Sequence, residues 1–561
     1  MNILGISCWY HDAAACLLCD GVIVAAAQEE RFNRKKHSPV FPIQAINYCL
    51  QHGNVSIDDI DYIGLYEKPF LKFSRVIVNH LKSYPYSLNN FLDTVPSWLE
   101  DRLITPLVLK RKLGYTGTVL FIRHHLSHAA SAFLVSPFEK AAILTADAVG
   151  EQASITTGCG NKNGITITKE IRYPHSLGLL YTTVTTYLGF RAHSGEGKVM
   201  GLAGYGNHTY ADKFNKIITI RADGSFNLNE RFFGFNKGRR MYSKEFIELF
   251  GKERNPEDPI EERHCNIAAG LQQLIEQIVI TIARNLYRET QTDCLCLAGG
   301  VFLNCVANNA ILEETPFNRI FIQPAAGDSG GALGVAAYIY HSLLGNPRTH
   351  SMQHAYLGPE FSHISIKRTL INHHLDFKEM DESELYTYVA RLIAANRIGG
   401  WFQGRMEFGP RALGNRSIIA NPCNPMMKEL LNKKVKKRES FRPYAPAVLE
   451  ENAKDYFRMN VSSPFMLLAS HIRKDKEQTI PAVTHIDKTA RVQTVSMQTN
   501  PKFWKLIKEF EKISGVPIVL NTSFNLKDEP IVCTPRDAID CFNRSQMDYL
   551  VVGKFVIEKN L

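Results

Sequence analysis

The segment Phe121-Ile-Arg-His-His-Leu-Ser-His-Ala-Ala-Ser-Ala-Phe133, with Thr145-Ala-Asp-Ala-Val-Gly150 after it, is the part of the sequence that most constrains the fold. His124 and His128 stand four residues apart in an alanine-rich run that predicts a helix, so both imidazoles share one helix face. Asp147 follows an apolar strand predicted over residues 141–146. Two histidines and a carboxylate suit a divalent first-row metal. The histidine pair alone is equally consistent with capping or core residues.

Composition narrows the class of protein. A chain of 561 residues is too long for one core, so we expect two or three domains. The net charge of +10 suits anionic substrates as well as nucleic acid. The sequence has no apolar run of about 18 residues, so we expect no membrane span and no membrane partner. The first residues resemble a strand rather than a signal peptide, which makes a cytoplasmic location the default expectation.

The first 60 residues predict three consecutive strands, at 2–7, 13–19 and 22–28, and then a helix over 42–52. The loop Trp9-Tyr-His-Asp-Ala13 exposes His11 and Asp12 to whatever the sheet edge binds. The polar segment 29–37 is either a solvated loop or the place where Lys36 meets an anionic ligand. A second strand pair near 154–168 indicates that the first subfold is repeated.

Residues 69–113 are predicted to be helical and are rich in aromatic and basic side chains. They have no motif that identifies a ligand. We interpret them as a helical insertion that covers the site or binds an acceptor.

Three glycine-rich stretches point to phosphate chemistry. The first, residues 194–206, predicts a loop whose backbone closes on phosphate beside Lys198, although a tight linker looks the same. In the second, an apolar strand leads through Gly299-Gly300 into a helix start. The third, residues 320–331, places Asp328 at the end of a strand. Asp147 and Asp328 are thus expected at similar strand ends in two half-domains of an actin-like nucleotide fold.

The pattern breaks after residue 345, so we predict an N-terminal domain over 1–345, a linker over 346–358 and a C-terminal domain over 359–561. The C-terminal domain combines arginines and lysines with loop glycines in 404–417 and 433–443, followed by Arg491 and by the hydroxyls and amides of 519–525. Guanidinium groups bind phosphate oxygens bidentately, which favours a small phosphorylated ligand. The basic run 433–438 alone is as consistent with a solvated helix or a nucleic-acid patch.

Together these stretches resemble the NodU/CmcH family of O-carbamoyltransferases over nearly the whole chain. The resemblance is carried by Tyr10-His-Asp-Ala-Ala14, Glu29-Glu-Arg-Phe32, His124-His-Leu-Ser-His-Ala-Ala-Ser-Ala132, Gly299-Gly-Val-Phe-Leu-Asn304, Gly404-Arg-Met-Glu-Phe-Gly-Pro-Arg-Ala-Leu-Gly414, Phe441-Arg-Pro-Tyr-Ala-Pro446 and Asn521-Thr-Ser-Phe-Asn525. It implies an α/β protein with two parts. The N-terminal domain would have a duplicated actin-like (ASKHA) fold with a metal site, similar to the metal-binding subunit of tRNA threonylcarbamoyl transferases. The C-terminal domain would be YrdC-like.

The resemblance also implies the chemistry. The C-terminal domain would form carbamoyl-adenylate from carbamoyl phosphate and ATP, and the adenylate would pass inside the protein. The N-terminal domain would transfer the carbamoyl group to a hydroxyl of a small secondary-metabolite or sugar-like acceptor. Iron(II), or another divalent metal, would be the cofactor, with Mg²⁺ possible beside ATP.

The site residues implied by the resemblance fall into four groups. His11 would be the general base, paired with Asp12, although a loop histidine bonded to Asp12 is the structural alternative. The metal ligands would be His124, His128, Asp147 and Asp328. The N-terminal nucleotide would contact Lys36, Glu196, Lys198, Gly299, Gly300 and Asn304. Carbamoyl phosphate and ATP would contact Arg411, Lys436, Arg442, Arg491 and Ser523.

Two other functions compete with this reading. A tRNA-modifying enzyme of threonylcarbamoyl type shares the two-domain chemistry, but the sequence has no compact basic and aromatic array for RNA, so we expect no nucleic-acid partner. A sugar-kinase-like or actin-like regulator without transfer activity would leave the C-terminal arginines and lysines without a role. The acceptor and the oligomeric state are not predicted.

Overall fold

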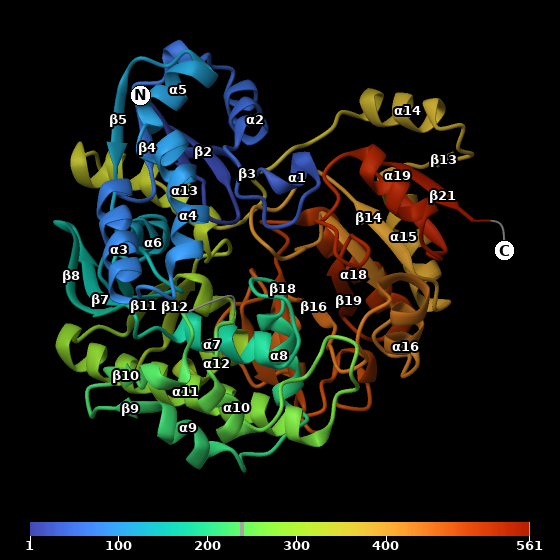
Figure 1. Ribbon diagram of the computed structural model, residues 1–561. Coiled ribbons are helices and arrows are strands. Elements are labelled where there is room, and N and C mark those ends of the chain that lie inside the picture. The colour runs from blue at the N-terminus through green and yellow to red at the C-terminus, as the bar shows by residue number, and fades with distance from the viewer. Residues whose placement is uncertain (236–239, 560–561) are drawn as a thin grey trace. The chain divides into compact units, whose positions relative to one another are not determined.

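The computed structural model describes residues 1–235 and 240–559, which divide into two compact units (Figure 1). The N-terminal unit comprises Met1–Glu29 and His37–Met352. The C-terminal unit comprises Glu30–Lys36 and the chain from Gln353 onward. The division after Met352 lies inside the segment 346–358 that the sequence indicates as a linker. Residues 30–36, by contrast, leave their sequence neighbours and join the C-terminal unit.

The N-terminal unit contains two five-stranded sheets with the same topology. In the first, β1 pairs antiparallel with β2 and parallel with β4; in the second, β6 pairs antiparallel with β7 and parallel with β11. The sheet orders β3-β2-β1-β4-β5 and β8-β7-β6-β11-β12 therefore correspond strand by strand. This confirms the predicted repeat and gives the duplicated arrangement of an actin-like fold. The strands are β1 (Asn2–Ser7), β2 (Ala14–Cys19), β3 (Val22–Gln28), β4 (Tyr62–Leu65), β5 (Thr118–Phe121), β6 (Ala141–Ala146), β7 (Ala153–Asn161), β8 (Gly164–Arg172), β11 (Cys294–Ala298) and β12 (Arg319–Ile322).

Two helices connect the sheets and position the site. Helix α6 (His124–Phe133) packs on β6 and β11, α13 (Asp328–Ala337) packs on β1 and β2, and the two helices pack on each other. Their close approach depends on Gly334, where a Cβ atom would lie 1.9 Å from the carbonyl oxygen of Ser127. The first residues of both helices consequently meet, and both N-terminal dipoles favour an anion there.

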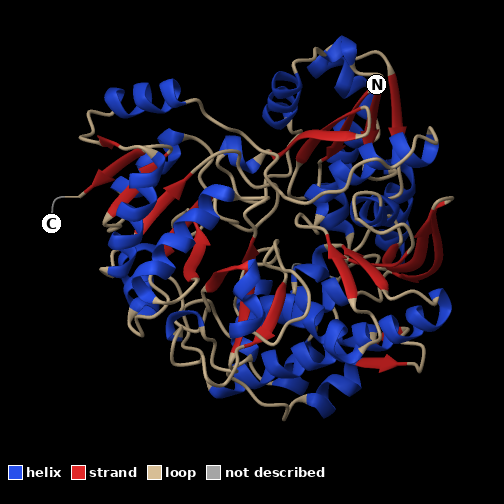
Figure 2. Cartoon of the chain, turned by 180° about the vertical axis from the view of Figure 1, so that it is seen from behind, coloured by secondary structure: helices blue, strands red, loops and turns tan. Residues whose placement is uncertain are grey.

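The remaining helices surround these sheets, and the β7–β8 hairpin forms one outer edge (Figure 2). Among the described residues, only α11 (Glu262–Thr290) is long and apolar enough to cross a membrane, and its most apolar window is 72% buried inside the protein. Core packing therefore explains its composition. The other elements are α2 (Ile43–Gly53), α3 (Pro69–Lys82), α4 (Leu88–Ser97), α5 (Thr105–Leu113), α7 (Leu177–Tyr187), α8 (Glu196–Ala203), α9 (Ala211–Ile217), β9 (Ile218–Ile220), β10 (Phe226–Leu228), α10 (Lys244–Phe250) and α12 (Cys305–Glu314).

Three expectations from the sequence need correction. Most of the predicted glycine loop 194–206 is helix α8, because its small residues tolerate a helical backbone. The segment 29–37 contains the short helix α1 (Glu30–Asn33), whose Arg31 side chain is buried, so it is not a solvated loop. Asp147 and Asp328 do not lie at corresponding strand ends of two half-domains. The strands that precede them, β6 and β12, lie in the same sheet, and Asp328 begins α13, which packs on the first sheet.

The C-terminal unit is built on one nine-stranded mixed sheet of order β13-β21-β20-β14-β15-β19-β16-β18-β17. Side chains alternate between its faces, as strand geometry requires. Trp401 packs with helices α15 and α18 on one face, and its neighbour Phe402 packs with α14, α16 and α19 on the other. The strands are β13 (Lys378–Glu379), β14 (Gly399–Phe402), β15 (Arg416–Ala420), β16 (Ala445–Leu449), β17 (Leu468–His471), β18 (Thr489–Val495), β19 (Ile518–Ser523), β20 (Tyr549–Val552) and β21 (Phe555–Glu558). The helices are α14 (His363–Asn372), α15 (Glu382–Ala394), α16 (Met427–Leu431), α17 (Ala453–Tyr456), α18 (Pro501–Ser514) and α19 (Pro535–Asn543).

Candidate active sites

The N-terminal unit brings together the four predicted metal ligands, His124, His128, Asp147 and Asp328, and buries all of them. The Nε2 atoms of His124 and His128 lie 3.1 Å apart, and each lies within 3.2 Å of Asp147 Oδ2. Each also lies 3.7 Å from Asp328 Oδ1. The sequence spacing of four residues on α6 accounts for the histidine pair, and the crossing of α13 over α6 supplies Asp328.

In this cluster, burial and the neighbouring groups shift the pKa values of the side chains in opposite directions. Burial raises the pKa of Asp147, but hydrogen bonds with His124 and His128 outweigh it and hold that pKa well below its usual value. Burial lowers the pKa of His128, but the hydrogen bond with Asp147 and the nearby charge of Asp328 raise it to about 9. Asp147 and His128 therefore each stabilise the charged form of the other, because their side chains lie in direct contact.

The donor set fits a divalent cation. Two imidazole nitrogens and two carboxylate oxygens converge with all ligand atoms within 4.8 Å of one another. Among the described residues, the buried Oδ1 of Asp328 accepts no hydrogen bond of good geometry. A cation placed between these atoms would satisfy that oxygen and both imidazoles. Nitrogen and oxygen donors of this kind suit iron, manganese or zinc alike.

His11 lies beside the metal cluster and is held by a carboxylate. Its Nδ1 atom lies 2.9 Å from Asp12 Oδ2, and its Nε2 atom lies 3.9 Å from Asp328 Oδ2. The other oxygen of Asp12 contacts Nδ1 of His37 at 2.9 Å. Burial lowers the pKa of His11, but the charge of Asp328 and the bond to Asp12 raise it to about 10. Asp12 thus fixes the orientation of His11 and leaves Nε2 facing the cluster.

The predicted glycine turn also reaches this site. Gly299 has a φ of 101°, and a Cβ atom there would lie 2.1 Å from the carbonyl oxygen of Ala146, at the end of β6. A Cβ atom on Gly300 would lie 3.0 Å from Asp147 Oδ1. The turn therefore passes directly over the metal cluster, and only glycine permits this approach.

A second cluster, of cations, occupies the C-terminal unit. Lys436 is buried and its Nζ atom donates to the carbonyl oxygen of Asn525 at 3.0 Å, to its side-chain oxygen at 2.9 Å, and to the carbonyl oxygen of Ser523. Burial and the neighbouring charge of Arg438 hold the pKa of Lys436 well below its usual value. The ammonium is fixed at the end of β19 by oxygens of two of the predicted hydroxyl and amide residues.

Arg442 and Lys36 lie near this lysine, and Arg491 lies near Arg442. Burial and the charges of Arg438 and Arg491 lower the pKa of Arg442 to about 10. Burial also lowers the pKa of Lys36, and the charge of Arg442 contributes. Neighbouring cations repel one another and lower one another's pKa. An anion that binds among them stabilises their charged forms. The sequence grouped Lys36 with the N-terminal nucleotide residues, whereas the structure places it among the C-terminal cations.

Comparison with known proteins gives these two clusters a context. Residues 2–337 match the carbamoyltransferase N-terminus and residues 390–559 match the carbamoyltransferase C-terminus. The chain belongs to the carbamoyltransferase family. It is an enzyme of the carbamoyltransferase class.

Individual relatives cover the whole length of this carbamoyltransferase. The uncharacterized protein sll1178 of Synechocystis is 45% identical and covers 100% of this chain and 97% of its own. Nodulation protein NolNO of Sinorhizobium fredii is 38% identical and covers 98% of this chain and 79% of its own. Among solved structures, full-length HypF in a phosphate- and nucleotide-bound form covers 62% of this chain and 47% of its own, at 13% identity and a TM-score of 0.33.

Other predicted residues of the carbamoyltransferase are engaged in local structure. Asn304 caps α12 by accepting from the Ala307 amide at 3.0 Å, and it donates to Gln272 at 2.8 Å. Glu196 accepts from the Thr182 hydroxyl and the His193 amide, each at 3.0 Å. Lys198 lies on the first turns of α8, with its Nζ 5.5 Å from the centre of the Phe190 ring. These contacts anchor α8 and α12 and do not by themselves identify a nucleotide.

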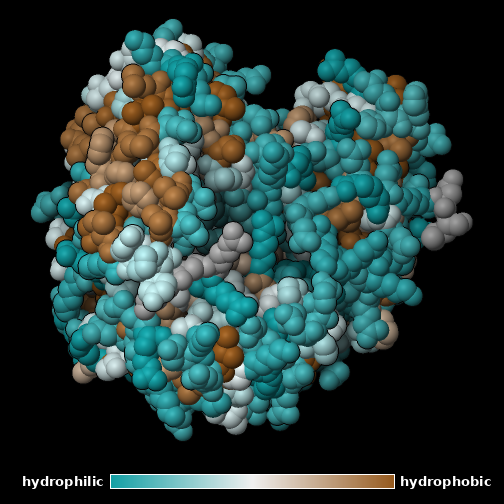
Figure 3. All heavy atoms as spheres, viewed as in Figure 1, coloured by the Kyte–Doolittle hydropathy of each residue, from teal (hydrophilic) through white to brown (hydrophobic). Residues whose placement is uncertain are grey.

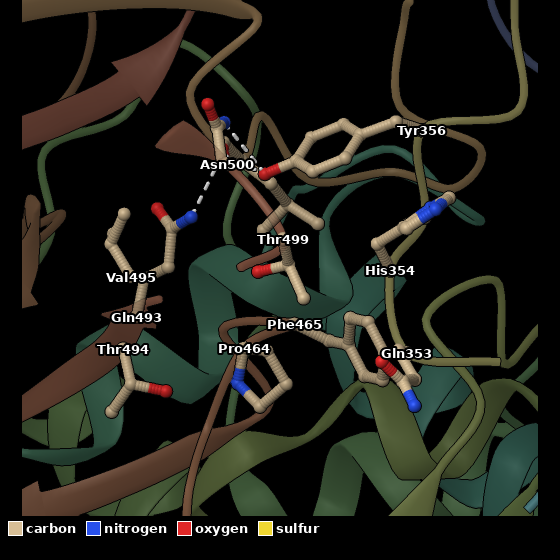
Figure 4. A pocket seen from close by; sticks show the side chains of 12 residues that line it. Gln353, His354, Tyr356, Pro464, Phe465, Gln493, Thr494, Val495, Thr499 and Asn500 are labelled. Atoms are coloured by element: carbon tan, nitrogen blue, oxygen red, sulfur yellow. Dashed lines mark hydrogen bonds between the residues drawn. The ribbon is translucent and has the colours of Figure 1, made fainter. Parts of the chain in front are cut away.

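Arg411 lies in the loop between β14 and β15. Glu407 shapes that loop by accepting from the backbone amides of Leu413 at 2.7 Å and Asn415 at 2.8 Å. A small cavity nearby, which Tyr356, Gln493 and ten other residues line, has a volume of about 10 Å³ (Figure 4). That volume holds about one water molecule, so this cavity is too small to hold a nucleotide.

Sequence reasoning missed three residues of the N-terminal site. The hydroxyl of Tyr66 lies 3.4 Å from Asp328 Oδ2, and the ring of His193 lies 5.0 Å from that of His11. Glu151 accepts from the backbone amide of His124 at 3.0 Å and so fixes the start of α6. His193 directly precedes the glycine-rich stretch 194–206, and this position could have marked it as a candidate site residue. Tyr66 and Glu151 have no local pattern that marks them.

Proposed function

We propose that this carbamoyltransferase is an ATP-dependent O-carbamoyltransferase with two active sites. This proposal rests mainly on one observation: the chain has two chemically different clusters of side chains, one in each compact unit. Crowded cations around Lys436 suit polyphosphate, and buried histidines and carboxylates around His11 suit metal-assisted acyl transfer. The resemblance to a YrdC-like C-terminal domain supports the same division of labour.

In the C-terminal unit, carbamoyl phosphate would be hydrolysed to carbamate and inorganic phosphate. A carbamate oxygen would then attack the α-phosphorus of ATP, which breaks the bond to the β-phosphate and releases pyrophosphate. Lys436, Arg442 and Arg491 would neutralise the phosphate oxygens, with Arg411 and Ser523 as further contacts and Mg²⁺ bound to ATP. Lys36 would act here as well, since it lies among these cations. The product is carbamoyl-adenylate.

In the N-terminal unit, a hydroxyl oxygen of the acceptor would attack the carbamoyl carbon and displace AMP. His11 Nε2 would accept the hydroxyl proton, with Asp12 holding the ring. A divalent ion, iron(II) by family resemblance, would neutralise Asp147 and Asp328 and the departing AMP phosphate when bound. With such an ion bound, the charge of Asp328 would no longer raise the pKa of His11, and the neutral ring that a base needs would be favoured. The acceptor would be a small secondary-metabolite or sugar-like alcohol.

The decisive experiment measures pyrophosphate release from the purified protein with ATP, with carbamoyl phosphate, and with both. Release that requires both substrates, in the absence of any acceptor, is the expected result. A panel of hydroxylated metabolites then tests whether an acceptor must bind first. If folded, metal-loaded protein releases no pyrophosphate under any of these conditions, the C-terminal site does not form an adenylate.

A further inference from the structure

The surface of the N-terminal unit has an apolar face formed by the segment from α3 to α5, residues 69–113. Ten of the described chain's exposed large apolar side chains fall within this segment. The most exposed are Tyr86 at 75%, Leu81 at 70% and Tyr84 at 69%. Figure 3 shows a brown, hydrophobic area over α3 and α4, on a molecule whose visible surface is mostly hydrophilic. Large contiguous apolar areas on a protein mark surfaces that contact a partner.

Helix α3 shows that this exposure is built into the fold. In a surface helix, polar residues normally face water and apolar residues face the core. In α3, Leu71, Val78 and Leu81 are exposed and lie on one helical face. Lys72, by contrast, is 4% exposed and pairs with Glu67, which is also buried.

Arg75 follows the same inverted pattern. Its guanidinium donates to the carbonyl oxygen of Gly150 at 3.3 Å and lies 5.2 Å from the centre of the Tyr173 ring. Helix α3 therefore attaches to the protein through Lys72 and Arg75, and it directs Leu71, Val78 and Leu81 outward. Covering this exposed hydrocarbon with an apolar medium or partner is favourable, because apolar area is removed from water.

Charge distinguishes between the possible occupants. Residues 69–113 contain seven basic and three acidic side chains, a net charge of +4 out of +10 for the whole chain. Lys82, Lys110, Arg111 and Lys112 are exposed. A second copy of the chain would bring the same positive charge against itself, which disfavours a symmetric dimer at this face. An anionic surface is complementary to it.

We propose that the α3–α5 face attaches the protein to an anionic lipid bilayer. The exposed leucines and Phe70 enter the boundary between headgroups and acyl chains, and Tyr84 and Tyr86 sit at headgroup level, where such amphipathic rings are enriched. Lys82 and the basic end of α5 contact the lipid phosphates. The protein lies on the bilayer and does not span it. This departs from the expectation of no membrane partner, which rested only on the lack of a long apolar run.

Vesicle co-sedimentation with the full chain tests this proposal. We expect binding to phosphatidylcholine vesicles that contain phosphatidylserine, and much weaker binding to phosphatidylcholine alone. The variant Val78→Asp/Leu81→Asp should lose binding to both. The variant Lys110→Gln/Lys112→Gln should weaken binding to the anionic vesicles by about fivefold for each cation removed, because each basic residue near such a surface contributes similarly.

A matched control uses equally exposed apolar residues elsewhere. Ile364 and Ile371 on α14 are 77% and 56% exposed, and Ile364→Asp/Ile371→Asp should bind vesicles like the wild type. Circular dichroism establishes that each variant is folded. The proposal is overturned if wild-type protein does not sediment with anionic vesicles, or if Val78→Asp/Leu81→Asp binds them normally. It is equally overturned if light scattering shows a dimer that this variant dissociates while vesicle binding is absent.

Discussion

At the scale of single residues, each site depends on groups whose charge is set by close neighbours. Asp12 holds His11 from one side and Asp328 attracts it from the other. Lys436 is held by oxygens of Ser523 and Asn525, so its position is fixed before any ligand arrives. We therefore assign one step of the proposed reaction to the site around His11 and another to the site around Lys436. Single substitutions in each site can separate the two steps.

The substitution His11→Ala should abolish carbamoyl transfer and leave acceptor-independent pyrophosphate release unchanged. The reason is that the proposed base acts only at the second site, and loss of a general base typically costs about 10²–10⁴-fold. Both rates are measured on the same preparation, with an acceptor found in the metabolite panel. His37→Ala is the matched control, because His37 contacts the same Asp12 carboxylate as His11 but is not a proposed base. Wild-type transfer by His11→Ala would remove His11 from the mechanism.

The substitution Lys436→Ala should reduce pyrophosphate release by about 10²–10³-fold, the usual effect of losing one preorganised group that stabilises developing charge. Thermal unfolding shows whether the loss of its buried hydrogen bonds also destabilises the unit. Lys433→Ala is the control, since Lys433 is exposed on the same turn. Equal rates for the two variants would show that Lys436 only supports the fold.

The substitution His128→Ala should lower the bound divalent metal by about tenfold or more, because even partners outside the direct ligand set change metal affinity by that amount. Elemental analysis by mass spectrometry provides the measurement and also identifies the metal. His125→Gln serves as control, since His125 bonds to Thr145 at 2.7 Å outside the proposed ligand set. Unchanged metal content in His128→Ala would exclude it as a ligand.

At the scale of elements, the sequence predicted those strands and helices whose pattern of apolar and polar residues is local. Strands expected at 2–7, 13–19 and 22–28 match β1, β2 and β3 within a residue, and the expected helix containing His124 and His128 is α6. Segments whose structure depends on distant packing were not predictable. Residues 194–206 were taken for a loop because glycine permits one, yet packing makes most of them helix α8. Asp328 was expected at the end of a strand, because no local signal shows that it begins α13 and that this helix crosses to the first sheet.

The crossing of α6 and α13 should be sensitive to side-chain volume. Gly334→Ala adds a methyl group where a Cβ atom would meet the Ser127 carbonyl oxygen, so we expect destabilisation of about 1–3 kcal/mol and lower metal content. Both effects follow because α6 supplies two ligands and α13 supplies one. Gly197→Ala, where a Cβ atom would meet nothing within 4 Å, should be neutral or slightly stabilising. Thermal unfolding and elemental analysis on both variants distinguish these outcomes.

At the scale of the whole molecule, the two units are not simple consecutive blocks. The segment Glu30–Lys36 belongs to the C-terminal unit, although the chain on both sides of it belongs to the N-terminal unit. Its Arg31 is 4% exposed and donates to the carbonyl oxygen of Gly409 at 2.8 Å. The C-terminal unit is therefore completed by residues from the first tenth of the sequence, which no inspection of local pattern would show.

A substitution of Arg34 tests whether the segment Glu30–Lys36 serves the C-terminal unit. Its guanidinium donates to the carbonyl oxygens of Ile531 at 2.7 Å and Pro530 at 2.8 Å. Charged hydrogen bonds of this kind contribute about 1.5–3 kcal/mol each, so Arg34→Ala should destabilise the C-terminal unit and, by displacing Lys36, slow pyrophosphate release. Metal content of the N-terminal unit should not change. Lys35→Ala, an exposed neighbour, should leave all three quantities unaltered. If Arg34→Ala instead lowers metal content and spares pyrophosphate release, the segment serves the N-terminal site, as its position in the sequence would imply.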